Sequence, residues 1–209
     1  MTNILIVDDH SVVRSGIRQF LASTDDLMVT AEAATGQDGL AQALQGNFDV
    51  VVLDVTLPDI NGLEVLKRIR RKKPALPVLI FSMLSEDDFA IPALGSGASG
   101  YLSKDSAPEN ILTAIRTVAG GARYVSPFLA EKLLSGNVAI GQSLPHDTLS
   151  WREMEVLLQL SKGVSLTNIG KQLHLSVKTV STYRARILEK LSLASNAELT
   201  RYVLEQKLG

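Results

Sequence analysis

The sequence predicts a doubly wound α/β domain with a five-stranded parallel sheet, followed by a small all-α helix-turn-helix domain. In the first 120 residues, short apolar runs alternate with segments of helical periodicity. These runs are too short for buried helices and lack the alternation of half-exposed strands, so they indicate a parallel sheet covered on both faces. From residue 147 onward four helical segments follow, and no strand candidate occurs among them.

The strands and helices of the first domain follow one another in strict alternation. The predicted strands are 4–7, 28–33, 50–53, 78–81 and 100–102, and the predicted helices are 11–22, 37–45, 62–72, 86–94 and 107–119. Ser106 and Glu109 have the spacing of a capping box before the last helix. Pro92 lies inside the fourth helix, where proline costs about 3 kcal/mol, so we expect that helix to be kinked, shortened or partly unwound.

The composition changes after this domain and divides the chain into three parts. We expect the α/β domain at 1–121, a linker at 122–146 with one short helix at 126–134, and the helical domain at 147–209. Ser150 and Glu153 form another capping box, and Ser165 and Ser176 are placed to cap the next two helices.

The charge and the rare residue types narrow the class of protein. Residues 1–120 hold 10 Lys and Arg against 15 Asp and Glu, whereas residues 121–209 hold 11 against 7. This split suggests that only the second part meets a polyanion, although ordinary surface charge also explains it.

The absence of cysteine excludes disulfides and thiolate metal sites. No apolar run approaches the roughly 18 residues of a membrane span, so we expect a cytoplasmic protein with no membrane segment.

Polar side chains cluster at the predicted carboxyl ends of the strands. Asp8 and Asp9 follow the first strand and Asp54 follows the third. Strand ends of a doubly wound sheet border one crevice, so the three carboxylates can share a site. Their repulsion raises at least one pKa unless a cation binds, and an all-oxygen site favours Mg²⁺.

A hydroxyl and an ammonium group complete this cluster. Ser82 ends the fourth strand and Lys104 follows the fifth, where both can hydrogen-bond the oxygens of a phosphoryl group on Asp54. Taken singly, a strand-end Asp usually caps a helix and a loop Lys is usually solvated. Five suitable residues at the ends of four strands together predict a phosphoryl acceptor site.

Residues 3–120 resemble the receiver domain of response regulators. The matching pieces are ILIVDDH at 4–10, VVVLDVTLPDINGLE at 50–64, LIFS at 79–82 and GASGYLSKD at 97–105. The resemblance implies that Asp54 is phosphorylated by a sensor histidine kinase or a small acyl phosphate. It further implies that Asp8, Asp9, Asp54 and the backbone carbonyl of Thr56 hold Mg²⁺, and that Ser82, Tyr101 and Lys104 form the phosphoryl-binding switch. Such a domain catalyses its own phosphorylation and dephosphorylation and is otherwise not an enzyme.

Residues 148–191 resemble the LuxR-type DNA-binding domain of the NarL/FixJ class, and the resemblance continues to about residue 208. It rests on Leu149, Glu153, Gly163, Ile169 and Thr179, among others, with Tyr183 standing where the family more often has His. The second helix of the motif, about 177–191, is then the DNA-reading helix. Double-stranded promoter DNA is the implied partner.

A helical projection divides the side chains of this helix into two sides. Val180, Ile187 and Leu191 fall on one apolar stripe, and the opposite side is polar and partly basic. We assign possible base contacts to Ser181, Thr182, Ala185 and Arg186, and phosphate contacts to Lys178, Thr179, Arg184 and Lys190. A polar stripe on a surface helix is the simpler explanation of the pattern taken alone.

The resemblance also implies a homodimer and a regulatory mechanism. In the family the last helix forms the dimer contact, which here assigns Leu199, Tyr202 and Val203 to that face, although packing within the domain explains the same stripe. The leading hypothesis is a DNA-binding response regulator in which phosphorylation at Asp54 controls dimerisation or exposure of the reading helix, and thereby transcription.

Two other functions compete with this hypothesis. A phosphohydrolase with Asp54 as nucleophile is one, but Thr56 stands where such enzymes usually carry a second Asp. The other is a DNA-binding transcription factor that acts independently of phosphorylation and uses the receiver domain only for protein interaction. It predicts that Asp54→Asn leaves DNA binding unchanged.

Overall fold

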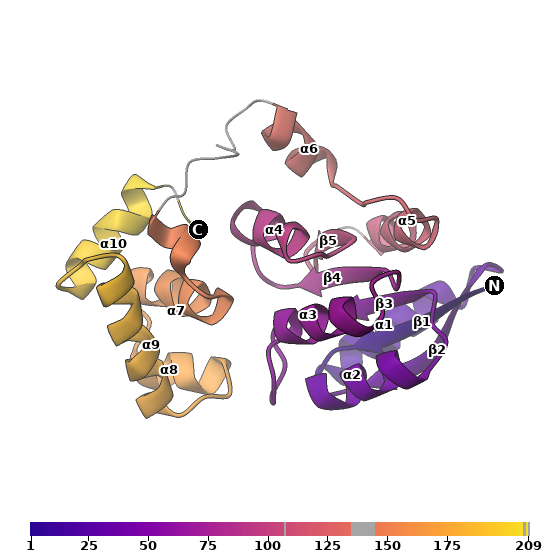
Figure 1. Ribbon diagram of the computed structural model, residues 1–209, viewed down its shortest axis with the longest axis horizontal. Helices are drawn as coiled ribbons and strands as arrows, with labels where there is room; N and C mark the ends of the chain where they lie inside the picture. Colours follow the sequence, from indigo (N-terminus) through magenta and orange to yellow (C-terminus); the bar gives the residue numbers. More distant parts are fainter. Residues whose placement is uncertain (107, 135–144, 207, 209) are drawn as a thin grey trace. The chain divides into compact units, whose positions relative to one another are not determined.

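The protein folds as two compact units, Met1–Ser135 and Gly136–Gly209 (Figure 1). The computed structural model describes residues 1–106, 108–134, 145–206 and 208. The segment 135–144 of the expected linker lies outside the described residues, as does Ala107, the first residue of the helix expected at 107–119. None of the helices in the described part combines the length and apolar character needed to cross a bilayer.

The first unit is the predicted doubly wound α/β fold. Its five strands are all parallel in the order β2-β1-β3-β4-β5. They are β1 Thr2–Val7, β2 Leu27–Ala33, β3 Val50–Leu53, β4 Val78–Ser82 and β5 Gly100–Ser103. The helices between and after them are α1 Ser11–Leu21, α2 Gly36–Gln45, α3 Gly62–Lys72, α4 Glu86–Gly95, α5 Pro108–Ala119 and α6 Pro127–Leu134.

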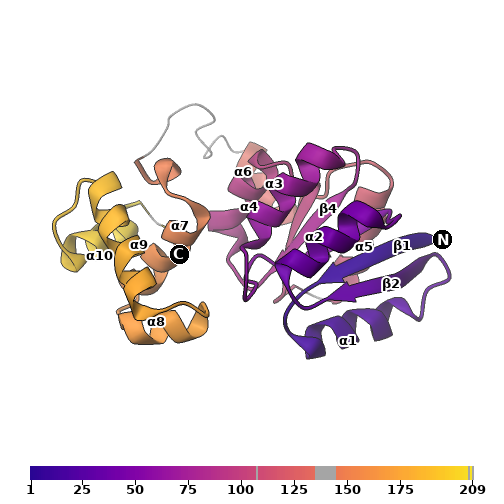
Figure 2. The ribbon, with the colours of Figure 1, turned by 60° about the horizontal axis from the view of Figure 1, so that its bottom comes forward.

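Helices cover both faces of the sheet, which explains why its central strands are apolar throughout. Ile4 and Ile6 of β1 pack with Ile17 of α1 and with Ile111 and Ile115 of α5 in one buried cluster. The opposite face carries α2 and α3 (Figure 2). Burial of successive residues on both faces is typical of a parallel sheet, as the unbroken apolar runs predicted.

The first unit extends beyond the expected boundary at residue 121. Tyr124 is buried in the core cluster and forms an isolated β-bridge with Gly100. The short helix expected at 126–134 is present as α6, and it packs against α4. Tyr124 and α6 therefore belong structurally to the α/β unit, although we assigned them to the linker.

Pro92 does not interrupt the fourth helix. α4 runs without a break over Glu86–Gly95, so the expected shortening and unwinding are wrong, and a kink stays a prediction. Phe89, Ala90 and Ala93 are buried, and α4 packs on β5. This burial offsets the loss of one backbone hydrogen bond at the proline, because tertiary packing outweighs local helix preference.

The second unit is all-helical, with η1 Pro145–Thr148, α7 Trp151–Ser161, α8 Leu166–Gln172, α9 Val177–Lys190 and α10 Asn196–Glu205. The expected caps are confirmed: Ser150 and Glu153 form the capping box of α7, and Ser165 and Ser176 accept backbone N–H bonds at the starts of α8 and α9. Gly170 lies against the turn to α9, since a Cβ there would stand 2.7 Å from the Leu175 carbonyl oxygen.

Arg70 of α3 ties two loops of the first unit, those containing Pro74–Leu76 and Gly97, to its own helix. Its guanidinium donates to the carbonyl oxygens of Gly97, Pro74 and Leu76 over 2.6–2.9 Å. Burial lowers the pKa of Arg70, and the nearby charge of Arg123 adds to this effect. The side chain therefore holds the loop after α4 against the end of α3.

Replacing Arg70 by Lys should destabilise the first unit by about 2 kcal/mol, because a single ammonium cannot reach all three carbonyl oxygens. Urea unfolding followed by far-UV circular dichroism measures this, since the only tryptophan, Trp151, lies in the second unit. Arg71→Lys, one residue along on the exposed side of α3, is the matched control and should change nothing. Equal stability of the two variants would contradict this role for Arg70.

Candidate phosphoacceptor site and nucleic-acid interface

The sheet register brings two of the predicted carboxylates side by side. Val7 pairs with Leu53 at the ends of β1 and β3, so Asp8 and Asp54 leave the sheet at the same level. The Asp54 N–H donates to the Val7 carbonyl oxygen over 2.8 Å, which continues the ladder into the site. Both carboxylates are buried, with exposed fractions of 2% and 3%.

Lys104 bridges these two carboxylates. Its ammonium nitrogen lies 2.6 Å from Oδ2 of Asp8 and 2.6 Å from Oδ2 of Asp54. The backbone N–H of Lys104 donates to the Ser82 carbonyl oxygen over 2.8 Å, which fixes the lysine just past the end of β5. The structure therefore brings together Asp8, Asp54 and Lys104, as we expected from their places after β1, β3 and β5.

Burial and charge act in opposite directions on this cluster. Burial raises the pKa of Asp54 above its ordinary value, and the adjacent Asp8 carboxylate adds to this, although Lys104 partly offsets both effects. Burial alone would lower the pKa of Lys104, but attraction and hydrogen bonds to Asp54 and Asp8 outweigh it and raise that pKa. The lysine is thus held protonated beside a carboxylate whose ionised form is disfavoured.

The acidic residues have the geometry of a cation site. Ligand atoms of Asp8, Asp9, His10 and Asp54 all lie within 4.8 Å of one another. The ring Nδ1 of His10 lies 2.7 Å from Asp9 and 3.2 Å from Asp8. Carboxylate oxygens are the ligands that Mg²⁺ prefers. Sequence reasoning missed His10, whose only signal was its position directly after the Asp pair.

Thr56 and Ser82 contact residues of the cluster, and Tyr101 is linked to the residues after β4. The Thr56 N–H donates to Oδ1 of Asp54 over 3.2 Å. Ser82 is fully buried, and its Oγ accepts a hydrogen bond from the Leu84 N–H over 3.3 Å. Tyr101 is also fully buried, and its hydroxyl donates to the Leu84 carbonyl oxygen over 2.8 Å. Two hydrogen bonds thus connect the end of β4 to the tyrosine through Leu84.

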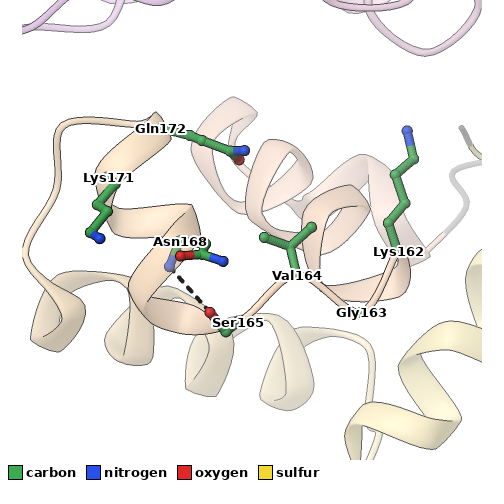
Figure 3. A pocket seen from close by; sticks show the side chains of 7 residues that line it. All are labelled: Lys162, Gly163, Val164, Ser165, Asn168, Lys171 and Gln172. Atoms are coloured by element: carbon green, nitrogen blue, oxygen red, sulfur yellow. Dashed lines mark hydrogen bonds between the residues drawn. The ribbon is translucent and has the colours of Figure 1, made fainter.

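The helix α9 presents the two sides that the projection predicted. Val180, Ile187 and the following Leu191 are buried, whereas the exposed side contains Lys178, Ser181, Thr182, Ala185 and Arg186. The preceding helix α8 and the turn after α7 border an open hollow of about 600 Å³ with Lys162 and Lys171 on its rim (Figure 3). Ser165 at its base accepts the N–H of Asn168, as the drawn bond shows.

Two residues assigned to phosphate contacts have partners within the second unit. The Lys190 ammonium lies 2.6 Å from Oε2 of Glu153, and the Arg184 guanidinium donates to Asn196 over 2.6 Å. Burial alone would raise the pKa of Glu153, but hydrogen bonds from Lys190 and Ser150 outweigh it and lower that pKa. Lys190 therefore stabilises the packing of α9 against the start of α7.

The residues assigned to a dimer face lie mostly inside the second unit. Leu199 and Val203 are buried, and α10 packs against α7. The Tyr202 hydroxyl lies 2.8 Å from Nδ1 of the buried His146, with the rings edge to face. Leu204 is the exposed apolar residue of α10, at 72%. Packing within the domain, the alternative we left open, thus explains Leu199 and Val203 in this structure.

Comparison with known families matches both units. Residues 4–116 match the response regulator receiver domain, and residues 147–203 match the bacterial regulatory proteins of the luxR family. The first match contains every residue of the carboxylate and lysine cluster, and the second contains α7, α8 and α9.

Individual relatives match over nearly the whole chain. The response regulator GacA of Pseudomonas protegens is 40% identical over 96% of this chain and 94% of its own length. The response regulator UvrY of Escherichia coli K12 is 34% identical over 100% and 96%. The structure of RcsB from Salmonella enterica serovar Typhimurium, bound to promoter rprA with phosphomimetic BeF3-, is 26% identical over 97% and 98%, with a TM-score of 0.64. The chain therefore belongs to the DNA-binding response regulators of two-component systems, which join a receiver domain to a LuxR-type helix-turn-helix domain.

Proposed function

We propose that Asp54 accepts a phosphoryl group and that this modification changes DNA binding by the second unit. The observation that carries the proposal is the buried Asp54 carboxylate, held 2.6 Å from the Lys104 ammonium beside a second carboxylate. A carboxylate oxygen of Asp54 attacks phosphorus, and the P–N bond of a kinase phosphohistidine, or the P–O bond of an acyl phosphate, breaks. The leaving imidazole or carboxylate takes the bond's electron pair.

Asp8, Asp9, Asp54 and the Thr56 carbonyl would hold Mg²⁺ during this transfer. Three carboxylates with one lysine leave an excess of negative charge, which fits a divalent cation. When bound by these residues, Mg²⁺ would neutralise charge on the phosphoryl oxygens. Lys104, already hydrogen-bonded to Asp54, would turn its ammonium to an oxygen of the new phosphoryl group.

Ser82 and Tyr101 would transmit the modification. A phosphoryl group adds nearly two negative charges, which draw the Ser82 hydroxyl toward Asp54. This movement weakens its bond with the Leu84 N–H and disturbs the bond between Leu84 and Tyr101. The packing of α4 and β5 is the two-state element that the phosphoryl group biases.

In the second unit, α9 would enter the major groove of promoter DNA. Ser181, Thr182, Ala185 and Arg186 would face bases, and Lys178, Thr179, Arg184 and Lys190 would approach phosphates. Active protein would be a homodimer reading two half-sites. Tyr202 and the exposed side of α10 would contribute to its contact. A protein with this task works in the cytoplasm, where the chromosome lies.

The phosphoryl mimic beryllofluoride with Mg²⁺ should raise the operator affinity of the full-length protein at least tenfold and increase its sedimentation coefficient. Asp54→Asn should abolish both effects, because beryllofluoride binds the Asp54 carboxylate. Gel-shift titration and analytical ultracentrifugation measure them. A phosphorylation-independent factor would show equal affinity in all four conditions, which would refute the proposed coupling.

Metal binding predicts a distinct effect of Asp54→Asn on stability. Because burial raises the pKa of Asp54 above 3.8, its ionised form costs stability at neutral pH, and the variant without metal should be more stable by on the order of 1 kcal/mol. The gain should disappear as pH falls through the raised pKa toward 3.8, where the wild-type carboxyl is neutral too. Mg²⁺ should stabilise the wild type and not the variant.

Urea unfolding with a chelator, and then with Mg²⁺, measures these differences. Asp26→Asn is the matched control, since Asp26 is exposed and its hydrogen bond with Arg116 lowers its pKa. That variant should lose a little stability and keep the response to Mg²⁺. A destabilised Asp54→Asn protein in chelator, or one that Mg²⁺ stabilises fully, would count against the proposed site.

Lys178→Gln should weaken DNA binding to a similar degree on all sequences and reduce the slope of log affinity against log salt by about 0.9 for each bound subunit, or about 1.8 for the proposed dimer. The reason is that Lys178 is exposed on the reading side and no described contact engages its ammonium group. Fluorescence anisotropy at several salt concentrations gives the slope. Lys67→Gln, an equal charge change on the exposed side of α3, should leave the slope unaltered. An unchanged slope for Lys178→Gln would remove this residue from the phosphate contacts.

A further inference from the structure

The exposed side of α9 contains an apolar line that the polar contacts do not use. Val177, Ser181 and Ala185 are spaced by four residues, so they lie along one edge of the helix. All three are exposed, and Val177 retains 44% of its surface. Two of the three positions on this edge therefore offer methyl groups and no hydrogen-bonding atom.

The neighbouring Thr182 adds to the apolar character of this side. Its hydroxyl donates to the Lys178 carbonyl oxygen over 3.0 Å, which uses its only donor hydrogen within the helix. Thr179 is committed in a similar way, because its N–H and hydroxyl both bond to Ser176 at the helix start. Few side-chain donors thus remain near Val177 to read a base edge.

The position of Val177 makes this apolar surface relevant to sequence choice. It is the first residue of α9, and residues at the beginning of a recognition helix contact base edges. Single exposed apolar residues are common on surfaces and need no explanation by themselves. Here, however, the apolar residue lies on the side expected to enter the groove, where the thymine 5-methyl is the apolar group that bases present.

We propose that Val177, with Ala185 further along the same edge, reads thymine 5-methyl groups in the major groove, so that the protein selects thymine over cytosine at the base pair facing Val177. The inference rests on the proposed insertion of α9 into the major groove. It adds Val177 to the residues proposed to contact bases. The contact is an apolar one between the methyl groups of Val177 and the 5-methyl group of thymine.

A double-mutant cycle between protein and DNA tests the proposal. The probe is a duplex selected from a random pool by the full-length protein, in which each thymine is replaced singly by 2′-deoxyuridine. This replacement removes only the 5-methyl group. At the position facing Val177 it should weaken binding of the wild type about fourfold, as expected for one buried methyl group. Val177→Ser, which removes both methyl groups of the side chain, should remove that sensitivity.

The controls separate the methyl contact from the docking itself. Leu204→Ser removes the methyl groups of the large exposed apolar residue of α10 and should keep the wild-type uracil profile. If no uracil weakens binding while Arg186→Ala still does, or if Val177→Ser keeps the full uracil sensitivity, the methyl contact is refuted and the proposed docking of α9 stands. If Ser181, Arg186 and Val177 variants all bind the selected duplex as tightly as the wild type, the docking itself is refuted, and the methyl contact with it.

Discussion

The burial of three charged groups at the edge of one parallel sheet is the constraint on which the rest of the first unit depends. Asp8, Asp54 and Lys104 have almost no contact with water, and each would be costly to bury alone. Backbone bonds from Asp54 to β1 and from Lys104 to β4 fix the positions of the three groups before any side chain moves. The Lys104 ammonium could therefore move from the Asp54 carboxylate to an oxygen of a phosphoryl group without any rearrangement of the sheet.

The same rigidity explains how a change of charge at Asp54 could alter the hydrogen bonds of Ser82 and Tyr101 as a unit. Ser82 and Tyr101 are fully buried and are joined through the two backbone groups of Leu84. A buried hydroxyl that moves must break one bond and form another, since an unpaired polar group costs about 1–3 kcal/mol in such surroundings. The chain of bonds thus favours two discrete arrangements over a gradual shift, as a switch requires.

Local patterns predicted what local physics determines. The spans of α3 and β3 are the ones expected, and the other four strands differ from expectation by one or two residues, because apolar runs and strand-end polar residues leave direct signals in the sequence. The caps at Ser150, Ser165 and Ser176 were equally accessible. The sequence did not predict the hydrogen bonds between Arg70 and its carbonyl partners, which lie up to 27 residues away. It did not predict the ion pair between Glu153 and Lys190 either. The helix α4 continues through Pro92 because Phe89, Ala90 and Ala93 are buried against the rest of the unit. The sequence of the helix does not by itself predict this burial.

The internal partners of α9 also shape how the second unit can use its charge. Lys190 is tied to Glu153 and Arg184 to Asn196, so bringing either to a phosphate exchanges one polar contact for another and gains little net free energy. In the proposed docking of α9, the electrostatic part of DNA affinity would rest mainly on Lys178 and Arg186, for which the described part of the chain shows no such contact. A reading helix with few available charges binds weakly to arbitrary DNA, and its discrimination must come from contacts to the bases themselves. In the proposed docking, the apolar edge that begins at Val177 would add to that discrimination without adding charge.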